Sequence, residues 1–210
     1  MLLHNESEAR DYVAERCSPS AFAALETFAI RICNESKKQN LVAQSTLDSL
    51  WLRHIADSAQ LLDHVSRGTG VWLDIGTGGG FPGLVIAIMR PEFEMVMIEP
   101  RRLRVEWLTA ISDHLGVTNC RVLPLSIERT ETLDVAVISA RAFTNLPRLI
   151  ELSARFSTNA TEWVLPKGQS AAQDIDRLRN DLKPRFHVKQ SITDPDAKIV
   201  IGRGCMETRA

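Results

Sequence analysis

The hydrophobic residues of the first 65 positions recur at helical spacing. Apolar side chains fall three or four residues apart over Glu15–Cys33, and a second such stripe follows over Leu47–Leu62. No alternation of apolar and polar residues, which is typical of strands, interrupts them. We therefore predict that residues 1–65 form a helical cap on the remainder of the chain, residues 66–210, and are not an independent domain.

After Gly68 the pattern changes to short apolar runs separated by helical stretches. The expected strands are Val71–Ile75, Met95–Ile98, Cys120–Leu125, Leu133–Ser139 and Trp163–Leu165, and the expected helices between them include Leu84–Arg90 and Arg101–Leu115. Strands that are apolar along most of their length are typical of a parallel sheet whose two faces are both covered by helices. The sequence thus predicts a doubly wound, Rossmann-like α/β fold.

The last part of the chain has a third pattern. Two β-type runs, Phe186–Lys189 and Lys198–Ile201, flank the turn sequence Asp194–Asp196. Asp and Pro at this place indicate a tight connection between two antiparallel strands. We expect this hairpin to add an antiparallel strand to the edge of the parallel sheet, as at the C-terminal end of class I methyltransferases.

Composition narrows the range of functions. A chain of 210 residues suits one domain with an extension, and 44% hydrophobic with 24% charged residues is a globular composition. The formal charge of −1 argues against a protein that coats nucleic acid without specificity, so a nucleic-acid partner would meet a local basic patch. The four cysteines are far apart and indicate reduced thiols without a metal site. With no long apolar run, we expect a soluble, cytoplasmic monomer that does not enter a membrane.

The strongest motif is the glycine-rich segment Leu73–Gly83, which joins an expected strand to an expected helix. Glycines at such a junction allow a sharp turn and a close approach of the backbone to a ligand. Two cofactors are compatible with it. A dinucleotide fingerprint can be read at Gly78, Gly80 and Gly83, with Glu99 at the distance of the residue that binds a ribose. S-adenosylmethionine is the other candidate.

Asp74, the acid at the tip of the first strand, favours the methyl donor. A pyrophosphate would meet its carboxylate as a like charge, whereas the ammonium and sulfonium groups of S-adenosylmethionine would be attracted. Glu99 then suits the two ribose hydroxyls, because a carboxylate accepts hydrogen bonds from both. Ile127 and Glu128 follow the third expected strand, where they can meet the adenine. A NAD-binding dehydrogenase remains the less favoured alternative.

Further short motifs point to one family. They are Asn40–Val42, Arg53–Ser58, the Phe-Pro-Gly end of the glycine segment at Phe81–Gly83, Ser139–Phe143, Lys167–Gly168 and Thr193–Pro195. In combination they make the chain similar to the glucose-inhibited division protein B family, bacterial methyltransferases that act on a guanine N7 of small-subunit ribosomal RNA. The resemblance covers about Glu35 to Arg203.

The resemblance implies a class I fold, S-adenosylmethionine as donor with S-adenosylhomocysteine as product, and 16S ribosomal RNA as substrate. The near-neutral charge favours an RNA that is presented within a ribosomal particle over free RNA. It assigns Gly76, Phe81, Ile127, Glu128 and Arg141 to the site, beside the acids chosen above. The full set of expected cofactor-binding residues is Asp74, Gly76, Gly78, Phe81, Glu99, Ile127, Glu128 and Arg141; the expected RNA-facing residues are Arg141, Lys167, Arg101 and Arg104.

No catalytic residue is assigned, because guanine N7 carries a lone pair and loses no proton when it is methylated. His54 and Asp57 are three residues apart on one helical face and could form a catalytic pair, but we interpret them as a hydrogen-bonded link between the cap and the sheet. Two further functions remain open, namely a methyltransferase acting on a small molecule or protein, and a donor-binding module without activity.

Overall fold

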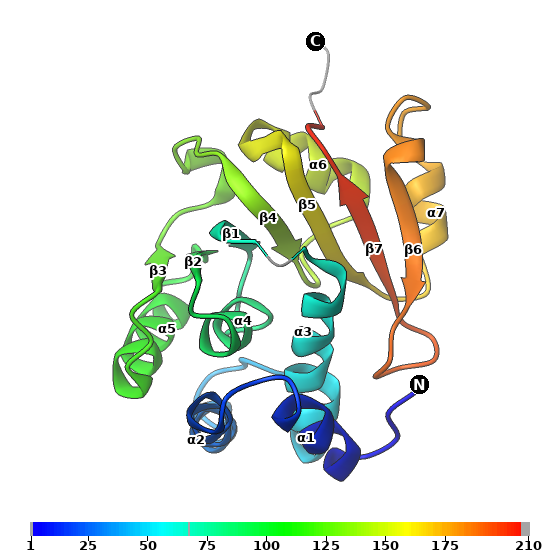
Figure 1. The fold of residues 1–210 in the computed structure, drawn as a ribbon. Coiled ribbons are helices and arrows are strands. Elements are labelled where there is room, and N and C mark those ends of the chain that lie inside the picture. Colours follow the sequence, from blue (N-terminus) through cyan, green and yellow to red (C-terminus); the bar gives the residue numbers. More distant parts are fainter. Residues whose placement is uncertain (1, 67, 207–210) are drawn as a thin grey trace.

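The residues described by the computed structural model, 2–66 and 68–206, contain a seven-stranded sheet in the order β3-β2-β1-β4-β5-β7-β6 (Figure 1). The strands are β1 (Gly70–Ile75), β2 (Phe93–Ile98), β3 (Cys120–Leu123), β4 (Val135–Ala140), β5 (Ser157–Lys167), β6 (Phe186–Gln190) and β7 (Lys198–Arg203). Strands β1 to β5 pair in parallel, and β7 is antiparallel to both of its neighbours. The predicted parallel sheet and C-terminal hairpin are confirmed.

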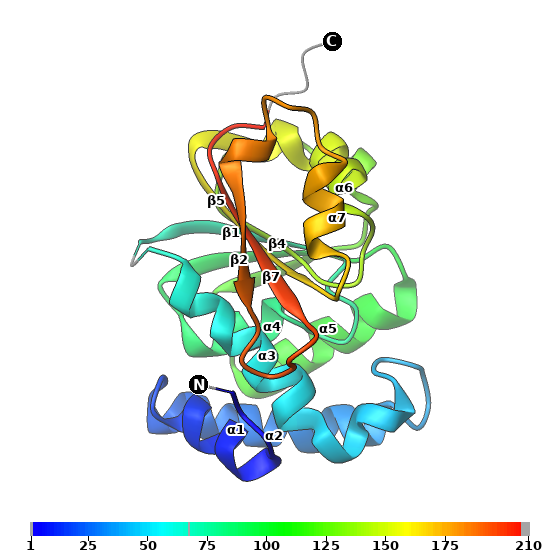
Figure 2. The same ribbon diagram turned by 90° about the vertical axis from the view of Figure 1, so that its right-hand side faces the viewer.

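Helices cover both faces of this sheet (Figure 2). They are α1 (Glu6–Ala14), α2 (Pro19–Glu35), α3 (Asp57–Ala59), α4 (Gly83–Met89), α5 (Arg102–Leu115), α6 (Leu146–Ser153) and α7 (Ala171–Asp176). Within the described ranges, none of the helices has both the length and the apolar character that crossing a membrane requires.

Alternate residues of the strands enter two separate hydrophobic cores. Trp72 and Met97 belong to the core shared with α1, α2, α4 and α5, whereas Leu73 and Val96 belong to the core shared with α6 and α7. Successive side chains of a strand point to opposite faces of its sheet, so a strand buried on both faces must be apolar at nearly every position. This double burial explains the continuous apolar runs in the sequence.

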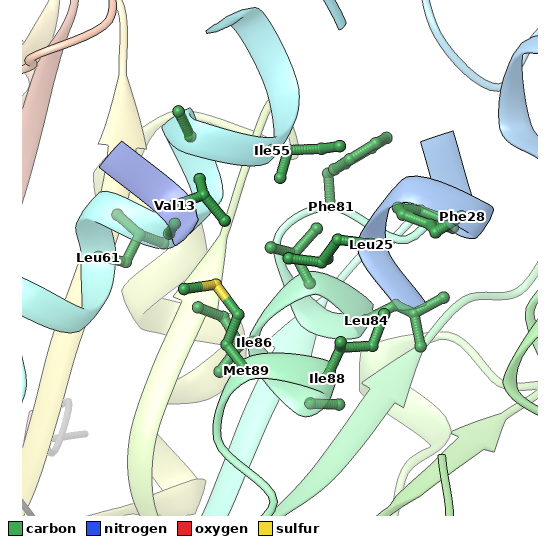
Figure 3. Close-up of a cluster of buried hydrophobic side chains, with 14 of the residues drawn as sticks. Val13, Leu25, Phe28, Ile55, Leu61, Phe81, Leu84, Ile86, Ile88 and Met89 are labelled. Carbon is green, nitrogen blue, oxygen red and sulfur yellow. The ribbon is translucent and has the colours of Figure 1, made fainter. Parts of the chain in front are cut away.

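The N-terminal cap packs on α4, directly behind the glycine segment. Figure 3 shows Leu25 and Phe28 of α2 beside Phe81 and Leu84, with Ile55 from the segment before α3 on the same cluster. The rings of Phe28 and Phe81 are 5.3 Å apart between centroids. Burial of these side chains from both partners stabilises the glycine segment in one conformation.

Strand β5 begins at Ser157, six residues before the expected start at Trp163. The added residues Ser157–Glu162 are mostly polar and carry no apolar signal. The register in which these residues of β5 pair with β4 shifts between Val135 and Val137. Thr161 fixes this irregularity, because its hydroxyl donates to the carbonyl of Val135 at 2.6 Å.

The expected helix over Leu47–Leu62 is broken into segments of different pitch. A 3₁₀ turn covers Gln44–Ser49, a π-helical turn covers Trp51–Ala56, and α3 and a second 3₁₀ turn (Gln60–His64) follow. The carboxylate of Glu6 in α1 accepts hydrogen bonds from the backbone amides of Trp51 and Leu52. π-helical turns are frequent at functional sites, and this one carries His54.

Candidate functional site

The sequence-predicted site residues follow the carboxyl ends of adjacent parallel strands. The register pairs Ile75 at the end of β1 with Ile98 at the end of β2 on one side and with Ala140 at the end of β4 on the other. The residues that follow these three strands are therefore neighbours along one edge of the sheet, where ligands bind in open α/β folds.

Three glycines of the loop have a positive φ, a backbone conformation that favours glycine. Gly76 has φ 71°, Gly78 has φ 61° and Gly80 has φ 118°. A Cβ on Gly76 would lie 2.8 Å from Cδ2 of Phe143, so the ring of Phe143 rests against the loop. A Cβ on Gly78 would lie 3.7 Å from the nearest atom, in the guanidinium of Arg104, which is an ordinary van der Waals contact. The backbone conformation, and not close packing, therefore favours glycine at position 78.

The other glycines of the dinucleotide register have packing roles. A Cβ on Gly80 would lie 3.0 Å from the ring of Phe28 in the cap, and one on Gly83 would lie 2.7 Å from the carboxylate of Asp74. Close protein atoms at both positions, together with φ 118° at Gly80, account for the missing side chains independently of any bound pyrophosphate.

Asp74 is fully buried, and both of its carboxylate oxygens have protein donors. Ser139 donates to Oδ1 at 2.7 Å, and the backbone amide of Gly83 donates to Oδ2 at 3.0 Å. The indole of Trp72 donates to the hydroxyl of Ser139 at 2.9 Å. Burial raises the pKa of the Asp74 carboxyl group, while these hydrogen bonds act in the opposite direction. In this structure Asp74 therefore joins β1, β4 and the start of α4.

Glu99 connects β2 to the glycine loop. Its carboxylate accepts hydrogen bonds from the backbone amides of Gly78 at 3.1 Å and Arg101 at 2.9 Å. A guanidinium nitrogen of Arg104 lies 3.7 Å from the same carboxylate and a second one donates to the carbonyl of Asn40. Arg104, predicted to face RNA, thus contacts both the predicted donor loop and the cap.

Ile127 and Glu128 lie in a short 3₁₀ turn (Ile127–Arg129) after β3. The Ile127 side chain is buried, and its carbonyl accepts a hydrogen bond from Arg155 at 2.6 Å. Glu128 is exposed, and hydrogen bonds from its own backbone amide and from Ser126 lower the pKa of its carboxyl group. The turn packs against α6, and Ile127 belongs to the hydrophobic core on that face of the sheet.

Arg141, the first residue after β4, is held by a network from the cap. It donates to Nδ1 of His54 at 2.9 Å, and its other terminal nitrogen lies 3.3 Å from both the Asp57 carboxylate and the carbonyl of Arg53. Its guanidinium carbon also lies 5.1 Å from the centre of the Phe81 ring. His54 and Asp57 therefore do link the cap to the sheet, and they do so through Arg141.

The network fixes the protonation state of His54. Because arginine only donates, Nδ1 must accept, and the proton resides on Nε2, which lies 2.7 Å from the hydroxyl of Thr46. The hydroxyl of Thr46 accepts from Nε2 and donates its own hydrogen bond to the carbonyl of Ala43 at 2.7 Å. Burial, reinforced by the charges of Arg141 and Arg53, lowers the pKa of His54 to about 3. The imidazole is thus a neutral acceptor that orients the arginine.

A cavity of about 810 Å³ lies beside this network. Four separate parts of the chain line it: the cap, the loop after β4, the end of β5 with α7, and the β6–β7 connection. In that order, each contributes one of the lining residues His54, Phe143, Lys167 and Asp194. Among the described residues, the predicted donor-loop glycines are not part of this lining, but Arg141 and Phe143 are. These two residues join the loop to the cavity.

Lys167 is largely buried at the end of β5. Its ammonium group donates to the carbonyl of Thr144 at 2.6 Å and lies 3.5 Å from the carboxylate of Asp174. Burial lowers the pKa of Lys167, and the nearby carboxylate opposes that shift. Of the four residues predicted to face RNA, Arg101 is exposed, whereas Lys167, Arg104 and Arg141 are partly buried by protein contacts.

Thr46 and Asp174 in this cavity went unnoticed in the sequence. Thr46 lies in a stretch without strong periodicity, and Asp174 looks like an ordinary residue of a polar helix. Phe143 had one usable signal, an aromatic residue directly after a buried strand, at the sheet edge where ligands bind.

Comparison with known proteins identifies the family. The family model GidB, described as rRNA small subunit methyltransferase G, matches residues 21–198. The chain belongs to this family. It is 49% identical to a Ribosomal RNA small subunit methyltransferase G of Erythrobacter litoralis over 99% of this chain and 100% of that one, and 45% identical to its namesake from Novosphingobium aromaticivorans over 97% and 90%.

Solved structures support the fold of this GidB family member. A SAM-dependent methyltransferase from Aquifex aeolicus is 15% identical with a TM-score of 0.55, covering 81% of this chain and 97% of that one. A precorrin-6Y C5,15-methyltransferase from Geobacter metallireducens is 10% identical with a TM-score of 0.54, covering 79% and 91%. The predicted class I methyltransferase fold is thereby confirmed, and the dehydrogenase interpretation of the glycine loop is not retained.

Proposed function

We propose that this chain transfers the methyl group of S-adenosylmethionine to N7 of a guanine in small-subunit ribosomal RNA, in the cytoplasm. The observation that carries the proposal is the junction at Arg141 and Phe143, where the glycine loop meets the cavity. A methyl transfer needs a donor site and an acceptor site in contact, and the junction supplies that contact. The volume of the cavity is within the range of about 300–1,000 Å³ that small-ligand pockets span.

The residues of the loop fit the donor. Gly76 and Gly78 are half-buried and have left-handed conformations without side chains, which permits a close approach of the donor to the backbone. Glu99 lies at the end of β2, where its carboxylate can exchange backbone partners for ribose hydroxyls. Asp74 stabilises the loop by accepting a hydrogen bond from the backbone amide of Gly83. When bound, S-adenosylmethionine supplies an electrophilic methyl group on a sulfonium.

The chain needs no general base for this reaction. Guanine N7 attacks with a lone pair in the plane of the ring, and no proton leaves. The protein can therefore act mainly by proximity and orientation, which are able to account for several orders of magnitude in rate. The neutral His54 and the Asp57 carboxylate hold Arg141 in one place, which gives the acceptor side a fixed cation beside the loop.

A folded particle is the substrate that the charge balance favours. With a formal charge of −1, the chain lacks the general basicity by which proteins bind any RNA. N7 lies in the major groove, which is too deep and narrow in A-form RNA for side chains to enter. The target guanine should therefore lie in a loop or an irregular region that the assembled subunit presents.

The test is methyl transfer from labelled S-adenosylmethionine to small ribosomal subunits from cells that lack this enzyme. Naked small-subunit RNA and large subunits serve as parallel acceptors, and the nucleosides are then separated. We expect label in 7-methylguanosine from the small subunit and none from the large subunit. Donor binding without label in any RNA would contradict the proposal and would favour a small-molecule or protein acceptor.

A further inference from the structure

Methylation at guanine N7 restricts how an enzyme can hold the base. The commonest protein contact to guanine, a pair of hydrogen bonds from arginine to O6 and N7, would occupy the atom that must react. The base has to be held by its faces or by its Watson–Crick edge. Aromatic side chains commonly bind unstacked bases of RNA by their faces. This reasoning rests on the function proposed above.

Phe143 is an aromatic side chain in a suitable position for such a contact. It is 39% exposed and is one of five large apolar side chains that are exposed among the described residues. Its ring rests against Gly76 of the loop and also lines the cavity. A base stacked on this ring would lie beside the group that the loop holds.

The backbone before Phe143 supports a specific placement of the ring. Ala142 has φ 52°, and no other non-glycine residue in the described ranges has a positive φ. In an extended strand, Arg141 and Phe143 would point to the same face. The left-handed residue between them breaks this alternation: Arg141 contacts His54 of the cap, while Phe143 contacts Gly76. Such strained conformations concentrate at functional sites.

The loop that carries Phe143 is also anchored on its other side. Lys167 donates to the carbonyl of Thr144, the next residue, and Asp174 accepts from the amide of Leu146 at 3.3 Å. The buried pair of Lys167 and Asp174 thus fixes the loop from β5 and α7. An exposed ring on a loop with anchors at both ends is pre-organised for stacking.

We infer that Phe143 is the surface on which the acceptor guanine stacks during methyl transfer. Because stacking contacts only the face of the base, the N7 lone pair, which lies in the plane of the ring, stays free of protein hydrogen bonds. The roles at the site then separate: the loop holds the donor, Phe143 holds a face of the base, and Arg141 provides a fixed positive charge beside them.

The experiment compares Phe143→Leu with Phe143→Tyr. Leucine keeps an apolar cover on Gly76 but has no aromatic face, whereas tyrosine keeps the face. Stacking on one aromatic side chain corresponds to roughly a 5- to 150-fold change in binding. We expect kcat/KM for small subunits to fall within that range in Phe143→Leu, and Phe143→Tyr to stay within about threefold of the wild type. The Kd for S-adenosylmethionine, measured by calorimetry, should be unchanged in both.

Val188→Ala provides a matched control, since Val188 is 37% exposed but lies on β6 outside the cavity lining. The inference is overturned if Phe143→Leu keeps wild-type kcat/KM. It is equally overturned if the donor Kd of Phe143→Leu weakens by the same factor as kcat/KM, because the ring would then only cover the donor loop. Failure of the proposed function itself looks different: the wild-type protein would methylate no RNA.

Discussion

The two halves of the site are built in different ways. The half that we propose binds the donor consists mainly of one continuous segment, from Asp74 to Gly83, with Glu99 directly after the next strand. The cavity half draws on the cap, the loop after β4, the end of β5 with α7, and the β6–β7 connection. The glycine segment can therefore be recognised as a motif in the sequence, whereas the residues of the cavity come together only when the chain folds.

The difference also extends to how each half is held. Backbone conformation shapes the loop, through the left-handed glycines Gly76 and Gly78. Side-chain networks shape the cavity, through His54 and Asp57 on Arg141 and through Asp174 on Lys167. A substitution in the loop should affect donor binding first, whereas one in the networks should affect stability and acceptor use together.

The largest effect is expected where the two halves meet. Arg141→Met removes the donor of three hydrogen bonds, so that Nδ1 of His54 and Oδ2 of Asp57 lose the bonds they accept from Arg141. Losing charge-assisted bonds in a partly buried place should lower the free energy of unfolding by about 2–3 kcal/mol. Urea denaturation measures it. Arg148→Met is the control, because Arg148 forms an exposed pair with Glu151 and its loss should change the free energy of unfolding far less than the loss of Arg141. Equal losses of stability in the two variants would show that the network around Arg141 does not stabilise the fold more than an exposed ion pair does.

The next effect is a pH dependence of the free energy of unfolding that arises from His54, in the cavity half of the site. With the folded pKa of His54 near 3 and an unfolded pKa near 6.5, the unfolded chain binds one more proton between these values. Stability from this group is therefore complete above pH 6.5 and is lost as the pH falls. At pH 5 the loss should be about 2 kcal/mol relative to pH 7.5, at about 1.4 kcal/mol per pH unit. Urea denaturation of the wild type and of His54→Gln at both pH values measures this loss of stability, which should be smaller in the variant. Identical losses would mean that other groups cause it.

A smaller effect is expected from Gly78→Ala. Alanine at φ 61° costs about 1–2 kcal/mol of stability, and its methyl group would cover the backbone that we propose the donor approaches. We expect the donor Kd to rise about tenfold, which corresponds to about 1.4 kcal/mol. Gly116→Ala is a matched control because Gly116 has φ 66° at the end of α5. It should cost similar stability in a thermal melt without changing donor binding; a parallel loss of donor binding would contradict the assignment of the loop.

The smallest effect is expected at Ala142. Ala142→Gly relieves the strain at φ 52° but adds flexibility to the unfolded chain, so the two effects nearly cancel, within about 0.5 kcal/mol. Ala110→Gly in the middle of α5 has no strain to relieve and should cost about 1 kcal/mol. Thermal melts of the two variants compare them. Equal losses would show that the left-handed turn before Phe143 stores no strain.

Much of the fold could be predicted because the relevant signals are local. Continuous apolar runs identified β1, β2 and β4, and the turn at Asp194–Asp196 identified the hairpin. The polar start of β5 and the change of helical pitch around His54 depend on partners distant in sequence, namely Val135 and Glu6. No local pattern carries that information.

The same division applies to the site. The strand-end positions of Asp74, Glu99 and Arg141 could be inferred from the sequence, because Asp74 is the second-last residue of β1 and the other two directly follow β2 and β4. Their contacts could not: the sequence did not indicate that Asp74 is bound by Ser139 and the amide of Gly83, or that Lys167 is buried against Asp174. Which oxygen meets which donor is decided by packing.

The most direct test of a divided site measures two constants for two variants. The donor Kd and the KM for small subunits are determined in Gly78→Ala and in Phe143→Leu. The structure predicts a raised donor Kd with little change in KM for Gly78→Ala, and the opposite for Phe143→Leu. If both variants raised the donor Kd and left the KM for small subunits unchanged, the division between a donor loop and an acceptor cavity would be wrong.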